Sequence, residues 1–485
     1  MSPPTRAALP VTLLLVGALG ALVPAAPARA EASLRWRGEL ASDLRLLADD
    51  SLAYERVENR AQAWLSARLS RHIAAQAHAR LFLTDYAAPG DLAGLTDRTR
   101  LTPWRLESDA LFVELRDVGL DGLDLRLGRQ QIIWGSADRF HPLSNLNPLD
   151  VEDPLLFGAV IANEMLSLSY RPDLWVGDED EPTLDDVALQ VVFVPFFKPA
   201  QLPQSAGLAF TDEEVFAHRA NTPLLRRLVD QQRALTAVGW TFAYEPRVVL
   251  PERTLDNSME AARLSWRLWD VDMGVSYFRG FDAFPRAEKV RAQVNVTDVR
   301  SDILLSYPRK QVLGFDMATS LGFLDGAGFW AEVGVTFHDD LFRVVDTGPA
   351  IGVNELEREL QAGAFVKATV GMDYTPTPWL YLNVQYLHGF LDEFGAGALD
   401  EYLVAGADFK LFTDRVLLRL FPIFDLTDGS YVLFPQLTFK PWTGGELSLG
   451  AFLYSSLLTG YDESTKFGSR AAGTSSVFVQ AKALF

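Results

Sequence analysis

Apolar and polar residues alternate along this chain, and the segment 34–46 is the first clear case. Its even positions hold mostly leucine, tryptophan and small residues, whereas its odd positions hold mostly arginine, glutamate and aspartate. Successive side chains of a β-strand point to opposite faces, so this segment has one apolar face and one charged face. A single strand of this kind fits a soluble sheet equally well. The pattern returns in roughly 18 to 20 segments up to Phe485, which is typical of a transmembrane β-barrel.

The N-terminus has the features of a secretory signal peptide. Arg6 gives a positive start, an apolar run follows over 7–23, and Ala28-Arg29-Ala30 is a small-residue cleavage site. No other stretch approaches the roughly 20 apolar residues that a membrane-spanning helix needs. We therefore expect residues 1–30 to be a signal peptide. We expect residues 31–485 to form one all-β domain, a single transmembrane antiparallel barrel.

The connections predict the number and direction of the strands. Short turns alternate with long excursions, as periplasmic turns alternate with outer loops in such barrels. With both termini in the periplasm the strand count is even, about 18 if 289–307 is a loop and about 20 if it is a hairpin. The long excursions are 86–108, 131–159, 196–257, 339–362, 389–401 and 456–474.

Short helices are expected in two of the long loops. In 196–257, Thr211 and Glu214 form a capping box, and Thr222-Pro223 has the residues of a helix start. A third helix is expected to open at 354–357. The loop 196–257 either folds into the barrel as a constriction or lies over its mouth, and a surface decoration is the alternative.

Aromatic residues gather where the predicted strands meet the turns, which is typical of the two membrane–water boundaries. We expect outer-membrane lipid and lipopolysaccharide to surround this belt. The C-terminal Phe485 resembles the signal that the outer-membrane assembly machinery recognises. The aromatic residues in question are Trp36, Tyr374, Trp379, Tyr386, Phe439 and Trp442.

The polar faces of the strands are rich in cations, although the whole chain has a formal net charge of −19. That acidity argues against nucleic acid as a partner. A cationic wall attracts anions, so we expect a small polar or anionic solute. A lattice of cross-strand salt bridges accounts for about half of these charges instead. Later strands add Lys367, Lys410 and Lys440 against Asp316 and Glu332. The arginines expected to line the pore are Arg35, Arg37, Arg45, Arg60, Arg68, Arg80, Arg116 and Arg126.

A segment rich in proline, asparagine and aspartate follows the strand that ends near residue 130. It runs from Gly128-Arg129-Gln130 through Trp134-Gly135 to Asn147-Pro148-Leu149-Asp150. With these motifs the chain resembles a porin-like family of Gram-negative outer-membrane proteins that carry a GRQ…WG…NP-x-D signature and have no settled substrate. It is more loosely similar to the alginate-export porins. The resemblance implies a channel or export pore and names no solute. The residues expected at a constriction are Arg129, Gln130, Trp134 and Asp138, together with the loop 196–257.

The sequence contains no catalytic or cofactor-binding motif that we recognise. The six histidines, His72 and His78 among them, occur in neither a Gly-x-Ser-x-Gly nor a His-Glu-x-x-His context, so we expect no enzyme activity and no cofactor. The acidic runs 178–181 and 150–153 are candidates for calcium, although solvated acidic turns explain them better. The sequence favours an outer-membrane channel. The alternatives are a closed structural or adhesive barrel and, less favoured, a barrel-embedded hydrolase.

Overall fold

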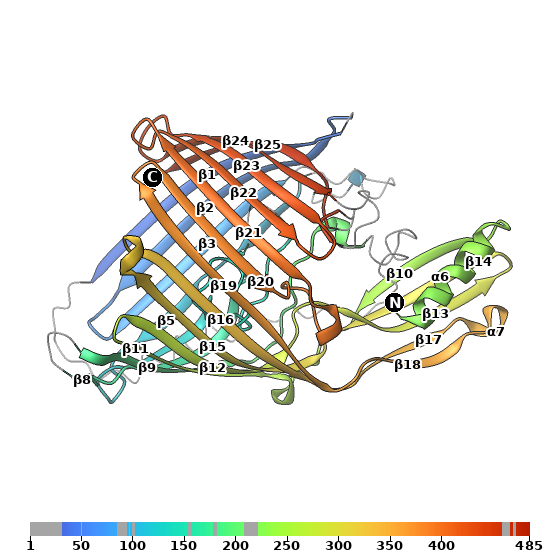
Figure 1. The fold of residues 1–485 in the computed structure, drawn as a ribbon, viewed down its shortest axis with the longest axis horizontal. Coiled ribbons are helices and arrows are strands. Elements are labelled where there is room, and N and C mark those ends of the chain that lie inside the picture. The colour runs from blue at the N-terminus through green and yellow to red at the C-terminus, as the bar shows by residue number, and fades with distance from the viewer. Residues whose placement is uncertain are drawn as a thin grey trace.

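The computed structural model describes residues 32–49, 51–84, 95, 96, 98, 102–153, 155, 158–177, 182–207, 222–457, 466–468 and 472–485. The predicted signal peptide lies outside these residues. The described chain forms one large closed sheet and, beyond one end of it, a separate five-stranded sheet (Figure 1).

The closed sheet is a barrel of 18 antiparallel strand positions. Its elements are β1 (Ser33–Leu47), β2 (Tyr54–Arg68), β3 (Ile73–Thr84), β4 (Trp104–Glu107), β5 (Leu111–Leu115), β6 (Leu123–Gln130), β7 (Asn163–Tyr170), β8 (Val176–Gly177), β9 (Pro182–Val194), β11 (Met259–Leu268), β12 (Val271–Phe281), β15 (Arg309–Leu321), β16 (Ala327–His338), β19 (Gly363–Thr377), β20 (Leu380–His388), β21 (Glu401–Leu411), β22 (Val416–Asp425), β23 (Ser430–Phe439), β24 (Gly445–Ser456) and β25 (Ser476–Leu484).

The barrel closes because β1 pairs with β2 on one side and with the last strand, β25, on the other. β4 and β5 share one position beside β3, and β8 continues β7 along β9. Phe485 extends this closure, since its backbone exchanges two hydrogen bonds with Gly38, of 2.8 and 3.0 Å. Its part in assembly stays a prediction.

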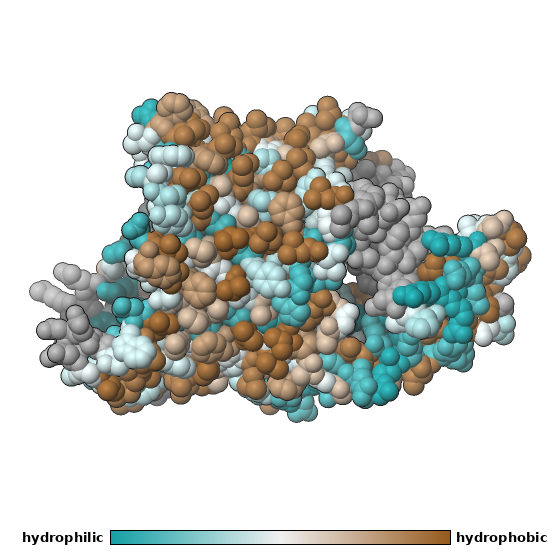
Figure 2. Space-filling model, in the orientation of Figure 1, coloured by the Kyte–Doolittle hydropathy of each residue, from teal (hydrophilic) through white to brown (hydrophobic). Residues whose placement is uncertain are grey.

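The outer face of the barrel is apolar, as the alternation in 34–46 predicts. Leu34, Trp36 and Leu40 are 65, 67 and 52% exposed, and brown side chains cover the barrel wall in Figure 2. A closed sheet leaves no backbone group unpaired, which is what the hydrocarbon layer demands. The protein is therefore a β-barrel of the Gram-negative outer membrane. Among the described residues, none of the helices has the length and apolar character to cross a membrane.

Exposed aromatic side chains mark the ends of the apolar wall. Trp36, Trp379 and Trp442 stand at the short-turn end, where both the first strand begins and the last one finishes. Tyr386 stands near the long-loop end and is 40% exposed. Short turns face the periplasm and long loops face outward in such barrels, so the five-stranded sheet lies on the extracellular side.

Three consecutive long loops build this extracellular sheet. Its strand order is β10-β14-β13-β17-β18, and the helix α6 (Pro223–Thr236) packs Leu224 on Val345. Thr222 caps α6, because its hydroxyl accepts a bond from the Leu225 amide, as the Thr-Pro signal predicts. The remaining elements are β10 (Thr241–Val248), β13 (Arg286–Asn295), β14 (Asp298–Ser306), β17 (Leu341–Asp346), β18 (Asn354–Leu360), α7 (Gly348–Ile351), η2 (Gln204–Gly207), η3 (Leu255–Asn257), η4 (Gly322–Leu324) and η5 (Ala396–Ala398).

Two sequence-based expectations need correction here. The segment 289–307 is a hairpin, yet it does not raise the count to 20, because β12 pairs directly with β15 and the hairpin belongs to the extracellular sheet. The helix expected at 354–357 is wrong, since these residues begin β18. Glu357 and Glu359 lie on one face of that strand and both bind Arg343 of β17, so a two-residue period prevails. The capping box at 211–214 lies outside the described residues.

Candidate pore and constriction

The loop between β6 and β7, residues 131–162, enters the barrel and is called the crossing loop below. Phe140, Leu143 and Leu146 are at most 2% exposed, so the loop is packed inside the wall. Asn147 ties its two ends together. The Asn147 side chain accepts a bond from the Ile132 amide (2.7 Å) and donates one to the Ile161 carbonyl (2.9 Å).

Two carboxylates on strands β15 and β16 hold the crossing loop. Glu332 of β16 accepts a bond from the Ala137 amide (2.6 Å), and Asp316 of β15 accepts one from the Ser136 hydroxyl (2.9 Å). The two acids are direct partners in the strand register, so they form one anchor. Gly135 has a φ of 109°, and a Cβ there would collide with the Glu332 carboxylate. A glycine is therefore required where the loop meets this anchor.

The returning half of the crossing loop is bound to the first two strands. Asp153 lies between Arg45 and Arg56 at 2.7 and 3.0 Å, and Arg56 also binds Glu152 at 2.7 Å. Burial by itself would raise the pKa of Asp153, but the bond and charge of Arg45 and the charge of Arg56 keep that pKa below its ordinary value. The crossing loop thus runs from β6 to β15 and β16 and returns past β1 and β2.

Replacing Asp153 by asparagine should destabilise the folded barrel at pH 7 by roughly 3 kcal/mol, because two buried guanidinium groups lose their shared anion. The lowered pKa of Asp153 adds stability that is present above the unfolded pKa of about 3.9 and is lost as the pH falls through the folded value. The difference between the two proteins should therefore shrink below about pH 4. Urea unfolding followed by tryptophan fluorescence measures both effects. Equal stability of the two proteins at pH 7 would show that the ion pairs of Asp153 with Arg45 and Arg56 do not stabilise the barrel.

An open space lies on the periplasmic side of the crossing loop. This cavity of about 260 Å³ is bounded by strands β1, β2 and β22 to β25 and by Arg139 and Leu155 of the loop. Phe434 and Gln436 form part of its wall. Its charged lining is mixed, with the cations Arg60, Arg139, Arg419, Lys440 and Lys482 facing the anions Asp43, Glu58, Asp153 and Glu446.

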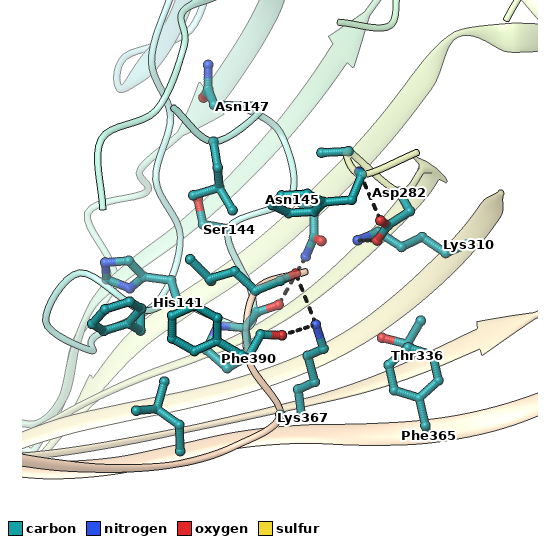
Figure 3. A pocket seen from close by; sticks show the side chains of 18 of the residues that line it. His141, Ser144, Asn145, Asn147, Asp282, Lys310, Thr336, Phe365, Lys367 and Phe390 are labelled. Carbon is teal, nitrogen blue, oxygen red and sulfur yellow. Dashed lines mark hydrogen bonds and ion pairs between the residues drawn. The ribbon is translucent and has the colours of Figure 1, made fainter. Parts of the chain in front are cut away.

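A second space, of about 60 Å³, lies between the crossing loop and strands β15, β16 and β19 (Figure 3). Lys367 donates bonds to the Phe390 and Leu391 carbonyls at 2.5 and 3.2 Å, and Lys310 pairs with Asp282 at 3.0 Å. Both ammonium groups are thus engaged. The space holds at most a few waters and joins the loop to the wall.

Most of the predicted pore arginines face the lumen and most carry an acidic partner. Arg60 binds Glu39 at 3.2 Å, and Arg80 binds Asp109 at 2.5 Å. Arg116 and Arg126 share Glu114, and Arg45 has Asp43 in addition to the loop. Arg37 lies over the ring of Trp64, 4.2 Å from its centroid. Arg35 and Arg68 lie near the periplasmic end of β1 and β2. Their places in the strand register put them on the same inward face as Arg37 and Arg60. The wall is therefore largely a lattice of salt bridges, which is the alternative to a cationic wall that the sequence allows.

The residues expected at the constriction separate into two groups. Gln130 is buried and donates to the Met165 carbonyl at 3.2 Å, and Trp134, 4% exposed, donates its indole N–H to Gln190 at 2.9 Å. Asp138 lies on the crossing loop near Arg419 of the far wall. Arg129 does not point into the lumen, because its register partner Leu111 is lipid-facing and 56% exposed.

The loop 196–257 is expected from the sequence to narrow the pore, but much of its described part belongs to the extracellular sheet instead. Its described part beyond residue 222 forms α6 and β10 of the extracellular sheet. Within the described residues of the loop, its start approaches the lumen, where Gln201 bridges to Asp150 of the crossing loop. The anchors Asp316 and Glu332 are visible in the sequence as wall charges, but nothing in the chain near residue 137 identifies them as loop partners.

The histidines named in the sequence lie in separate surroundings. His78 stacks on Trp64 and contacts Asp109 at 3.1 Å, whereas His72 contacts Asp117 at 3.4 Å near a turn. In the described part of the chain no three His, Asp or Glu side chains gather as metal ligands. Residues 178–181 lie outside it.

Comparisons with known proteins add little beyond the barrel itself. No family model and no curated protein matches the chain, so the resemblance carried by the GRQ…WG…NP-x-D motifs stays a prediction. Similar solved structures include OccK8 (OprE) of Pseudomonas aeruginosa, with 7% identity, 93% of this chain and 98% of the other covered, and a TM-score of 0.47. OccAB2 of Acinetobacter baumannii has 8% identity, 94% and 98% coverage and a TM-score of 0.43. OmpT, an outer membrane protein of Vibrio cholerae, has 10% identity, 94% and 99% coverage and a TM-score of 0.39.

Proposed function

We propose that this barrel is an outer-membrane channel for small polar solutes, with a preference for anions, and that the crossing loop is its constriction. The observation that carries the proposal is the cavity of about 260 Å³ beneath that loop, with Lys440, just after β23, and Lys482 of β25 in its lining. A loop that narrows the lumen without filling it leaves a path of limited width. Such a path selects by size and charge.

The charges in this cavity support the anion preference. Arg60 and Arg419 pair with Glu39 and Asp408. Asp43 pairs with Arg45, and Asp153 lies between Arg45 and Arg56. Lys482 lies opposite Glu446 in the strand register, and Lys440 has no ion-pair partner within the described residues, so these three groups leave one positive charge in surplus. Lys410 on β21 faces the same lumen and adds to it. A cationic surface enclosed by a low-dielectric wall concentrates anions.

The wild-type protein in a planar bilayer tests both parts of the proposal. We expect steady single-channel currents, and in a tenfold KCl gradient a reversal potential on the chloride side, with anions favoured roughly two- to fivefold. A reversal potential on the potassium side would contradict the anion preference alone. Complete absence of current would contradict the channel itself.

A closed structural or adhesive barrel is the second candidate, and one observation favours it. Apolar side chains fill much of the extracellular half of the lumen, including Phe140, Tyr402 and Phe452 in one cluster and Trp134 and Phe278 in another. The bilayer experiment decides between the two, because a closed barrel passes no current. The extracellular sheet would then be the part that acts.

A further inference from the structure

A charged cluster lies on the outer face of the barrel, away from the lumen. Register places Arg129 of β6 opposite Glu164 of β7, and both share the face of the lipid-exposed Leu127 and Leu166. Charged side chains on this face are costly within the hydrocarbon layer and far less so near its boundary. Their presence here therefore calls for a partner or a polar layer beside them.

Two cations contact the carboxylate of Glu164, and a third, Arg253, lies close enough for its charge to act on one of them. Glu164 contacts Arg129 at 3.3 Å and Lys198 at 2.5 Å, and Lys198 also donates to the Ala162 carbonyl at 3.1 Å. Arg253 stacks over Phe196, 5.6 Å from the ring centroid. Burial lowers the pKa of Lys198, and the positive charges of Arg129 and Arg253 lower it further, whereas Glu164 raises it. The three cations therefore repel one another. The cluster carries a surplus of positive charge.

The position along the strand places this cluster at the extracellular boundary of the membrane. Arg129 is one alternate position above Leu127 and near the end of β6, where the crossing loop begins. On the neighbouring β4, the outward Trp104 and Leu106 are 61 and 64% exposed. Exposed tryptophan and long basic side chains near the loop end of barrel strands are typical of the headgroup layer, where basic side chains reach polar groups.

We propose that Arg129, Lys198 and Arg253 form a binding site on the outer barrel face for a phosphate group of an outer-leaflet glycolipid headgroup. The surplus charge and the partly exposed guanidinium and ammonium groups match the charge and hydrogen-bond acceptors of a phosphate ester. Glu164 holds two of the cations together in the absence of the ligand and competes with the phosphate for them. The site is independent of the channel, since none of its side chains faces the lumen.

Binding of bis-phosphorylated lipid A to the full-length protein tests the site. The lipid is titrated into purified protein in detergent micelles with EDTA, and bound copies are counted by native mass spectrometry. Arg129→Gln with Lys198→Gln should weaken binding roughly tenfold or more, and Glu164→Gln should strengthen it several-fold. Arg279→Gln is the matched control, because Arg279 is also outward near the rim but is balanced by Glu260 at 3.5 Å. It should change binding less than about twofold.

Each other result overturns the proposal in a distinct way. Unchanged lipid A binding by a folded double variant, shown by retained heat-modifiable migration on gels, removes the site. Weaker binding after Glu164→Gln, restored by Mg²⁺, assigns the affinity to a cation bridge on the carboxylate. Displacement of lipid A by millimolar inorganic phosphate makes this a site for free phosphate.

Discussion

Replacing Asp316 and Glu332 together by alanine should raise the single-channel conductance several-fold. These two acids hold the crossing loop on strands β15 and β16, through Ser136 and the Ala137 amide. Each bond has an ionised acceptor, so each loss costs about 1.5–3 kcal/mol of anchoring. A loop that is released from β15 and β16 spends more time away from the constriction. The measurement is the current through single barrels in a planar bilayer.

The control for this variant is Glu260→Ala, which removes a carboxylate from the outer face of the barrel and should leave the conductance unchanged. A thermal melt of the double variant must still show a folded barrel, because Arg263 loses its partner Asp316. Unaltered conductance in a folded double variant would mean that the crossing loop is not the narrowest part of the path. Opening should also speed passage of larger solutes into liposomes.

Reversing the charge of Lys440 and Lys482 in the periplasmic cavity should reverse the ion selectivity of the channel. Lys440→Glu with Lys482→Glu changes the local charge by four units beside Glu446, in a cavity of about 260 Å³. With most arginines of the wall already paired, the reversed residues would dominate the field, and the channel should prefer potassium to chloride by several-fold. The shift of the reversal potential in a KCl gradient measures it. The effect should weaken at high salt, as the Debye length falls to about 3 Å at 1 M.

The matched control places the same charge change outside the barrel. Arg291→Glu with Arg300→Glu alters two exposed arginines of the extracellular sheet, on strands β13 and β14. Selectivity should stay on the anion side in that variant. If both double variants shift the reversal potential equally, the cavity lysines have no special part and the overall charge of the protein decides.

The sequence predicts the barrel well because one physical rule acts on every strand. Pairing in a closed sheet forces the apolar face of each segment toward lipid, so a short alternating stretch such as 34–46 reveals its own orientation. Arg129 shows how strictly the rule holds. It lies three positions after the inward Arg126 and therefore faces outward, which the motif around it does not reveal. The extracellular hairpin at 289–307 alternates as a barrel strand does, and only its pairing partners distinguish the two.

By itself, the sequence determines that this chain is a large even-stranded barrel with a charged lumen, because strand periodicity and turn length are local properties. Tertiary structure decides which long loop enters the lumen, which charges cancel and which remain. The crossing loop is held by Glu332, almost two hundred residues away, and by Arg45 of the first strand. Such contacts depend on the closure of the barrel, which brings distant strands to face each other, and no local pattern encodes them.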